Sequence, residues 1–318
     1  MPSTVNKSDV KRLATSFVVA ARTVGIGRAR ARRAALASVR TYREQLARFA
    51  GIRALDVWYS RVDASTIVDL ASGRRRRAVT RRLAAAQHHT NLDALPRLTE
   101  PAGGSRRFVE DPPLLTHVDE CGEDWITDVL ARYRASLPEE RRGLLARFRP
   151  HDAARKVVGV GSVGTRCYVV LLLGDRADEP LLLQVKQATA SVLEPYAGRS
   201  RHRHHGRRVI AGQHLLQTAS DIFLGWTGDG AAQYYVRQLW DMKGSMQLET
   251  MSGADLVEYG RLCGWVLARA HARTGDGVAI SGYLGSGDRF DGAVADFAEA
   301  YADQSQADYA EYLKAGPG

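Results

Sequence analysis

Cysteine is scarce in this sequence, and its three copies are scattered. Cys121, Cys167 and Cys263 form no C-x-x-C pair and have no histidines at zinc-finger spacing, which excludes a disulfide scaffold and a structural zinc site. No stretch reaches the roughly 20 apolar residues needed to span a bilayer, and the opening residues MPSTVNKSDVKRL lack the apolar run of a signal peptide. These absences predict a soluble cytoplasmic protein with no membrane partner.

Charge of both signs is present, but it is unevenly spread. The 318 residues are 45% hydrophobic and 25% charged, with a net charge of +10, which allows one large domain or two modest ones. Residues 1–107 carry 22 Lys and Arg against 7 Asp and Glu, and the rest carries 23 against 28. The first third is therefore +15 and the remainder −5, so an anionic partner is worth testing.

The basic first third reads as helical. Apolar residues at three- and four-residue spacing predict helices over residues 13–24 and 28–49, with most arginines of the second helix facing solvent. The arginine run at residues 74–77, followed by Arg81 and Arg82, has the charge of a nucleic-acid or phosphate-binding patch. No aromatic residues interleave with it. We therefore favour an exposed basic helix and do not expect nucleic acid as a partner.

The rest of the chain predicts an α+β fold in three parts. Proline and glycine predict a linker at residues 95–117, and a helical segment at 125–148 is broken by Pro138. Valine-rich and leucine-rich strands follow from Lys156, with a further strand at residues 233–239. Helices are expected at residues 207–219, 255–273 and 290–313. The expected domains are a helical portion at 1–150, a small antiparallel sheet at 151–250, and a helical continuation at 251–318.

The most informative motif is GVGSVG, in which Gly159, Gly161 and Gly164 have the spacing G-x-G-x-x-G. In a dinucleotide-binding fold these glycines open a helix, but the residues that follow, RCYVVLLLG, predict a second strand. A glycine hairpin between two strands suits the protein-kinase arrangement, in which backbone amides approach nucleotide phosphates. The alternative is an ordinary glycine turn. On the kinase-like interpretation, Ser162 also contacts the phosphates.

A strand lysine strengthens the nucleotide interpretation. Lys186 lies among apolar residues in LLLQVK, and a lysine in that setting needs an anion such as a nucleotide phosphate. Glu194 is the only acidic residue before the next helix that could pair with it, and Gln213 is a neutral alternative within that helix. The adenine would lie against the strand at residues 235–239, with Gln238 among its contacts. No catalytic residue is assigned.

Histidines gather in the segment RHRHHGRR, which contains His202, His204 and His205. Imidazoles bind transition metals, but the neighbouring arginines repel a cation and no carboxylate is near. A solvated or phosphate-facing loop is the preferred interpretation, so no metal ligand is assigned. His271 is expected to cap or pack the end of its helix.

At these residues the sequence resembles the bacterial domain-of-unknown-function family 2252, over nearly the whole chain. The segments that carry the resemblance include DVKRLATSFVVAAR, FVEDPPLL, ARKVVGVGSVGTRCYVVLL, LLLQVKQATASVLEPY, HGRRVIAGQHLLQTASDIFLGW and YYVRQLWDMKGS. This family is similar to the protein-kinase and aminoglycoside-phosphotransferase fold, with its segments apparently permuted. The resemblance implies ATP as the ligand and makes Asp9 a structural support of the site.

The family's C-G-D-A-H-x-x-N-F-G and N-D-F-D-E elements, similar to a catalytic loop and a metal-binding segment, do not occur in these 318 residues. Phosphoryl transfer needs carboxylates to orient the acceptor and hold Mg²⁺. The expectation is therefore an amino-terminally truncated member that binds nucleotide but is inactive alone, with Mg²⁺ only if the missing segment is supplied. A second polypeptide or a homo-oligomer would cover the exposed surface. Whether the chain is an enzyme is left open.

Two alternatives stay open at this point. One is a non-catalytic polyanion-binding or protein-interaction module that uses the basic first third. The other is a nonfunctional fragment.

Overall fold

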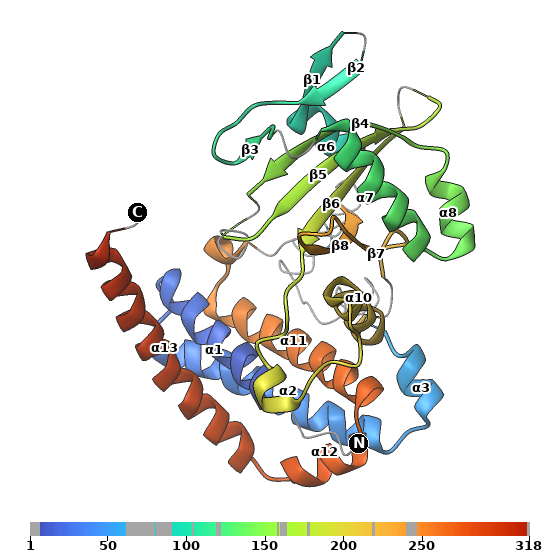
Figure 1. Ribbon diagram of the computed structural model, residues 1–318. Coiled ribbons are helices and arrows are strands. Elements are labelled where there is room, and N and C mark those ends of the chain that lie inside the picture. The colour runs from blue at the N-terminus through green and yellow to red at the C-terminus, as the bar shows by residue number, and fades with distance from the viewer. Residues whose placement is uncertain are drawn as a thin grey trace. The chain divides into compact units, whose positions relative to one another are not determined.

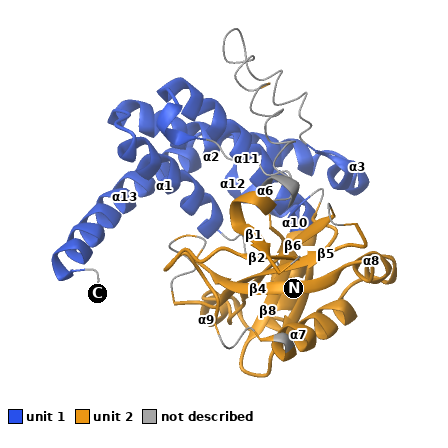
Figure 2. Ribbon diagram, turned by 90° about the horizontal axis from the view of Figure 1, so that it is seen from above, with its two compact units in different colours: residues 1–79, 215–218, 245–318 blue, residues 80–214, 219–244 orange. Residues whose placement is uncertain are grey.

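The computed structural model describes residues 7–61, 80, 91–103, 105–118, 122–157, 159, 164–176, 179–217, 220–239 and 247–316. The chain forms two compact units (Figures 1 and 2). A helical unit consists of residues 1–79, 215–218 and 245–318, and a sheet unit consists of residues 80–214 and 219–244. The predicted α+β class is confirmed, because the chain combines many helices with sheets that are antiparallel throughout.

Long amphipathic helices make up the helical unit. They are α1 (Lys7–Thr23), α2 (Arg28–Ala50), α3 (Ala54–Tyr59), α11 (Gly253–Thr274), α12 (Gly277–Leu284) and α13 (Arg289–Ala315), with a short 3₁₀ helix at Leu248–Thr250. Helix α2 packs against α1, α11, α12 and α13. The predicted helices at 28–49, 255–273 and 290–313 match α2, α11 and α13 closely.

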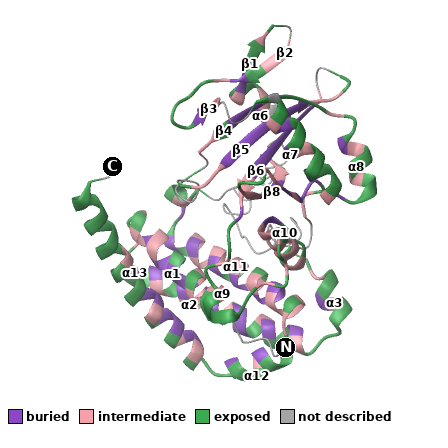
Figure 3. Cartoon of the chain, viewed as in Figure 1, coloured by how far each residue is buried: buried purple, intermediate pink, exposed green. Residues whose placement is uncertain are grey.

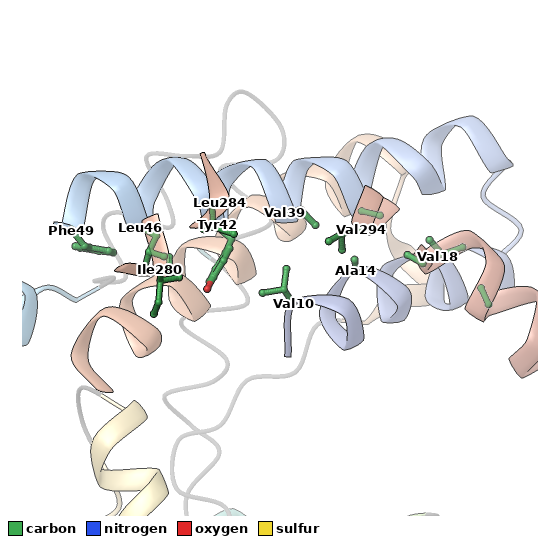
Figure 4. Packing of buried hydrophobic residues seen from close by; sticks show 14 of the residues in the cluster. Val10, Ala14, Val18, Val39, Tyr42, Leu46, Phe49, Ile280, Leu284 and Val294 are labelled. Carbon is green, nitrogen blue, oxygen red and sulfur yellow. The ribbon is translucent and has the colours of Figure 1, made fainter. Parts of the chain in front are cut away.

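Apolar side chains from four of these helices meet in one core (Figure 4). Val10 and Val18 of α1, Leu46 of α2, Ile280 of α12 and Val294 of α13 are all nearly inaccessible to solvent. Burying side chains of this size supplies about 1.5–3 kcal/mol each relative to exposure. The three-to-four-residue spacing of apolar residues therefore does place one stripe of each helix in the core.

Helices α2 and α11 approach each other through a small-residue contact. A β-carbon added to Gly264 would lie 2.1 Å from the carbonyl oxygen of Ser38, and one added to Gly260 would lie 2.8 Å from that of Ala34. Both distances are shorter than a van der Waals contact. Glycine at these two positions is therefore what allows the two backbones to pack so closely.

The sheet unit contains two antiparallel sheets. Strands β1 (Thr99–Ala102) and β2 (Ser105–Phe108) form a hairpin. The larger sheet has the order β3-β4-β5-β6-β8-β7. Its strands are β3 (Leu115–Thr116), β4 (Arg149–Lys156), β5 (Cys167–Leu173), β6 (Pro180–Gln187), β7 (Gly225–Gly228) and β8 (Gln233–Gln238). The helices are α6 (Asn91–Leu98), α7 (Glu123–Ser136), α8 (Glu139–Leu145), α9 (Glu194–Ala197) and α10 (His205–Leu216).

The larger sheet has apolar side chains on both faces. Figure 3 shows that β5 and β6 are buried along nearly their whole length. On one face Tyr168, Leu183 and Val236 pack with Tyr133 of α7, and on the other Val169 and Leu182 pack with Ala94 of α6. Successive residues of a strand alternate between these faces. The runs of β5 and β6 are therefore continuously apolar, which agrees with the valine-rich and leucine-rich strands expected after the glycines.

The predicted linker at residues 95–117 is corrected by the structure. This segment carries the end of α6 and the strands β1, β2 and β3. Pro96 lies within α6, Pro101 lies in the short strand β1, and Pro112 and Pro113 lie in the turn before β3. The sheet unit accordingly begins at Thr80 and includes α7 and α8, rather than beginning at residue 151.

None of the helices within the described residues combines the length and the apolar character that crossing a membrane requires.

Candidate functional site

The predicted glycine hairpin joins β4 to β5. These strands pair antiparallel, with Arg155 opposite Tyr168, so a strand and not a helix follows the glycines. Gly159 and Gly164 have φ angles of +139° and +76°, which side-chain-bearing residues rarely adopt. Gly161 and Ser162 lie outside the described residues. The strand context therefore excludes the dinucleotide-binding arrangement and leaves a glycine-rich connection between two antiparallel strands.

Lys186 lies at the same end of the sheet as this turn. It is the penultimate residue of β6 and pairs with Cys167, the first residue of β5 after the glycines. On its other side it pairs with Tyr235 of β8. Its side chain is half-buried, and within the described part of the chain it makes no hydrogen bond or ion pair. A lysine in this position is available to an anion.

The two partners proposed for Lys186 are elsewhere in the sheet unit. Glu194 begins the four-residue helix α9 in the connection after β6, and Gln213 lies in the second half of α10. Among the described residues neither makes a hydrogen bond or ion pair with Lys186. Pairing of Lys186 with either residue therefore stays a prediction.

Gln238 belongs to the opposite face of the sheet. It pairs with Leu183, whose side chain packs on the α7 side, and its backbone N–H donates to Asp221 Oδ2 at 2.5 Å. Because faces alternate along a strand, its side chain is directed away from the face of Lys186. Gln238 and Lys186 therefore do not share one surface.

The structure adds two basic residues that sequence reasoning missed. Lys156 ends β4 and follows the register that places Arg155 opposite Tyr168, so it lies beside Cys167. Arg237 of β8 lies opposite Gln184 of β6. Both residues are half-buried. Lys156, Lys186 and Arg237 thus share one face of three strands, which we call the cationic sheet face, with Cys167 and Tyr235 between them.

The electrostatics of Cys167 show that the three charges converge. Burial raises the pKa of its thiol, while the positive charges of Lys186, Arg237 and Lys156 act in the opposite direction. The thiol is therefore neutral at pH 7 and does not neutralise the cations. Burial also lowers the pKa of Lys156, opposed by Cys167 and Asp111, and raises that of Tyr235.

The histidine cluster precedes and begins α10. His204 Nδ1 accepts a hydrogen bond from the backbone N–H of Arg207 at 3.3 Å. Gln233 Oε1 accepts one from the backbone N–H of His205 at 2.7 Å. Burial lowers the pKa of both His202 and His204, so protonation is disfavoured there. The cluster thus anchors the start of α10 to the turn region of β7 and β8.

A cavity of about 460 Å³ lies beside the turn between β7 and β8, lined in part by Arg132, His204, Trp226 and Gln233. Its main polar groups already have partners. Arg132 pairs with Asp128 at 2.8 Å and donates to the carbonyl of Gly228 at 3.2 Å. The cavity contains none of the predicted phosphate-binding residues, so the cationic sheet face is the stronger candidate.

The arginines of α2 were expected to face solvent. Arg28 does, with 81% of its side chain exposed, but the side chain of Arg43 is only 11% exposed, which corrects the expectation there. Glu299 of α13 accepts from Arg28 at 2.8 Å and from Arg32 at 2.6 Å. Arg43 makes a two-point contact with the buried Asp291, at 2.9 and 3.0 Å. Acidic residues of a distant helix therefore neutralise much of this basic surface. The arginine run at 74–77, with Arg81 and Arg82, lies outside the described residues.

His271 packs at the end of α11, as predicted, and also joins a polar chain. Its Nδ1 lies 2.8 Å from the Tyr42 hydroxyl and its Nε2 lies 3.4 Å from Asp9 Oδ2. The hydrogen bond to His271 is the main cause that lowers the pKa of Asp9. Asp9 therefore ties α1 to α11 within the helical unit.

Fold and site define an α+β protein whose antiparallel sheet carries three cations on one face, next to a glycine-rich turn. The chain belongs to a family of uncharacterised proteins conserved in bacteria, DUF2252, whose family model matches residues 5–315. The family predicted from the sequence is thereby confirmed. Neither the curated proteins nor the solved structures provide a match to the chain.

Proposed function

We propose that this protein binds a nucleotide, with ATP as the first candidate, through its phosphates on the cationic sheet face. The observation that carries the proposal is the register of β5 and β6, which sets Lys186 beside the residue that follows the glycine turn. Backbone amides of a glycine-rich turn and a lysine ammonium group are complementary to phosphate oxygens.

The strand sequence supports a kinase-like interpretation of this site. Strand, glycine turn, strand and strand lysine follow one another in β4, β5 and β6. A protein kinase uses the same order of parts to hold the phosphates of ATP. We propose on this basis a phosphotransferase-like unit with permuted segments. Binding is the activity proposed for these residues, because the catalytic-loop and metal-binding elements are not among them.

The test is calorimetry with ATP and GTP on the full chain, with and without Mg²⁺. Saturable binding of the wild type is expected. Lys186→Ala should weaken it at least about tenfold, because a hydrogen bond to a charged group contributes about 1.5–3 kcal/mol. Lys314→Ala, which removes an exposed lysine of α13, is the matched control and should leave the affinity unchanged.

The same experiment separates this proposal from the polyanion-binding alternative. Binding of DNA or another polyanion through the basic first third should weaken steeply with salt and survive Lys186→Ala. Substituting the arginines at 74–77 should do the reverse. If folded wild-type protein binds no nucleotide at millimolar concentration, the proposal is wrong.

A further inference from the structure

We infer that the cationic sheet face is a polyphosphate site, in which Lys156 and Arg237 bind phosphates together with Lys186. The ligand class is an anion with at least two adjacent phosphate groups, and most of the affinity comes from those phosphates rather than from a base. This inference rests on the proposed function, because it concerns the same site, and it adds two binding residues and the part of the ligand that is recognised.

The first step is the availability of the three cations. Within the described residues no carboxylate lies within 4.0 Å of Lys156, Lys186 or Arg237, although every one of them is half-buried. Holding charged groups away from bulk water without partners is costly. Three such groups on one face are unfavourable to the empty protein, and an anionic ligand would reverse that cost.

The second step is the way Arg237 is held. Its Nε donates to Oε1 of the fully buried Gln184 at 3.1 Å. This contact leaves both terminal guanidinium nitrogens of Arg237 with no hydrogen bond to a described atom. Gln184 is thus a positioning residue, and the free edge of Arg237 has the two-donor geometry that suits a phosphate. The Gln184 amide nitrogen is itself buried without a hydrogen-bond partner in the described structure.

The third step is the spacing of the charges. Lys156 and Lys186 lie two strands apart, which is roughly 10 Å at the backbone. Lys186 and Arg237 lie on neighbouring strands, diagonal to each other in the register that pairs Lys186 with Tyr235 and Gln184 with Arg237. One phosphate can reach only part of this row, whereas the long side chains can close onto a chain of two or three phosphates. Three cations also match a charge of −3 or −4 better than that of a monophosphate.

The test is competition by bare phosphate chains, with ATP binding followed by calorimetry on the full-length protein. Inorganic tripolyphosphate should displace ATP with an affinity within about tenfold of that of ATP. Orthophosphate, AMP and adenosine should bind at least about a hundredfold more weakly, because they engage fewer of the cations.

Substitutions then assign the two new residues. Lys156→Met and Arg237→Gln should each weaken both ATP and tripolyphosphate about tenfold or more. Arg237→Lys should recover part of the loss because it keeps the charge. The matched control is Arg155→Met, which removes a cation from the exposed residue next to Lys156 on the other side of the strand. Circular dichroism and thermal melting establish that each variant is folded.

The outcomes separate the two ideas. If wild-type protein binds neither ATP nor tripolyphosphate, the proposed function fails and this inference fails with it. If ATP binds and Lys186→Ala abolishes binding, but Lys156→Met and Arg237→Gln bind normally, only the inference is overturned. Failure of tripolyphosphate to displace ATP would likewise overturn the inference and leave the nucleotide proposal standing.

Discussion

Cationic side chains gather in both units, but the two groups differ in their carboxylate partners. In the helical unit Arg28, Arg32 and Arg43 each contact a carboxylate of α13 at 3.0 Å or less. On the cationic sheet face, three cations have no carboxylate within 4.0 Å in the described structure. Paired cations stabilise a fold, whereas gathered and unpaired ones cost stability. Charge in the helical unit holds helices together, and the unpaired charge on the sheet is what the proposed ligand would neutralise.

The pairs of the helical unit form an ordered ladder. Moving forward along α1 and α2, the partners move backward along α13: Arg22 with Asp303, Arg28 with Glu299, Arg32 with Glu299 and Asp296, and Arg43 with Asp291. Packing of α13 antiparallel to α2 produces this order among the pairs of α2. Part of the basic charge of the first third is therefore paired within the helical unit.

The largest loss of stability is expected when the buried ion pair between Arg43 and Asp291 is broken. The carboxylate of Asp291 is fully inaccessible, and the side chain of Arg43 is 11% exposed. Asp291→Ala should lower the free energy of unfolding by about 3–5 kcal/mol, because it leaves a buried guanidinium unpaired. Urea denaturation measures the loss. The control is Asp296→Ala, whose carboxylate is 69% exposed; equal losses in both variants would contradict the argument.

The sheet face should respond in the opposite direction. Lys156→Met removes a half-buried, unpaired charge, so the ligand-free protein should gain on the order of 1 kcal/mol. The pKa of Lys156 is lowered from its ordinary 10.5. The unfolded chain then binds more protons between the lowered pKa and 10.5, so wild-type stability should rise with pH in that interval. Stability curves of wild type and variant should converge there; a variant less stable than wild type at pH 7 would refute this.

A smaller, pH-dependent effect on stability is expected from His117, which pairs with two carboxylates in the sheet unit. His117 Nε2 lies 3.0 Å from Asp152 Oδ2, and Nδ1 contacts Glu110 Oε1. Burial lowers the pKa of His117, but the hydrogen bonds to Asp152 and Glu110 outweigh burial and raise it above 6.5. The stabilisation that the protonated His117 gives to the folded protein is therefore complete below pH 6.5. It is lost as the pH rises through the pKa of His117 in the folded state.

We expect this loss to be on the order of 0.5–1 kcal/mol, since the imidazole is partly exposed. Urea titrations between pH 6 and 9 measure it. The variant His117→Gln should abolish this component of the pH dependence of stability. If the variant shows the same pH profile as the wild type, the protonated His117 is not its source.

The smallest effect should come from the exposed end of the ladder. Arg22 contacts Asp303 at 2.7 Å, but the carboxylate is 68% exposed. Asp303→Ala should cost at most about 0.5 kcal/mol, and 1 M NaCl should remove that difference because salt screens exposed pairs. Denaturation of both proteins at low and high salt is the measurement. A loss of several kcal/mol that persists in 1 M NaCl would show that the exposure of an ion pair does not determine how much it stabilises the helical unit.

Local patterns predicted the elements better than the contacts between them. The apolar spacing of α2, α11 and α13, and the continuous apolar runs of β5 and β6, depend on residues close in sequence. The strand β4 was missed, because it ends at Lys156, where the first strand was expected to begin. Lys186 and the glycine turn could be found for the same reason. Arg237 was missed because its proximity depends on the pairing of β6 with β8, two strands separated by α9, α10 and β7. Lys156 was missed because its place depends on the register of β4 against β5, which the sequence does not show.

Two other errors have the same origin. In the sequence alone, the arginines of α2 resemble a solvent-facing stripe, because α13 cannot be placed against them. The pair Arg43 and Asp291, for example, is separated by 248 residues. The strands β1 and β3 are two to four residues long, which is too short for a periodic signal. No local pattern could have given either result.

The division of the chain between the two units also fixes an order of assembly during synthesis. The sheet unit is complete once residue 244 has been made, whereas the helical unit needs α11, α12 and α13 from the last 74 residues to cover α1 and α2. A chain growing at about 5–20 residues per second therefore exposes the apolar stripes of α1 and α2 for many seconds. Helices α1 and α2 are therefore made before the sheet unit but covered after it, and a chaperone has that interval in which to bind them.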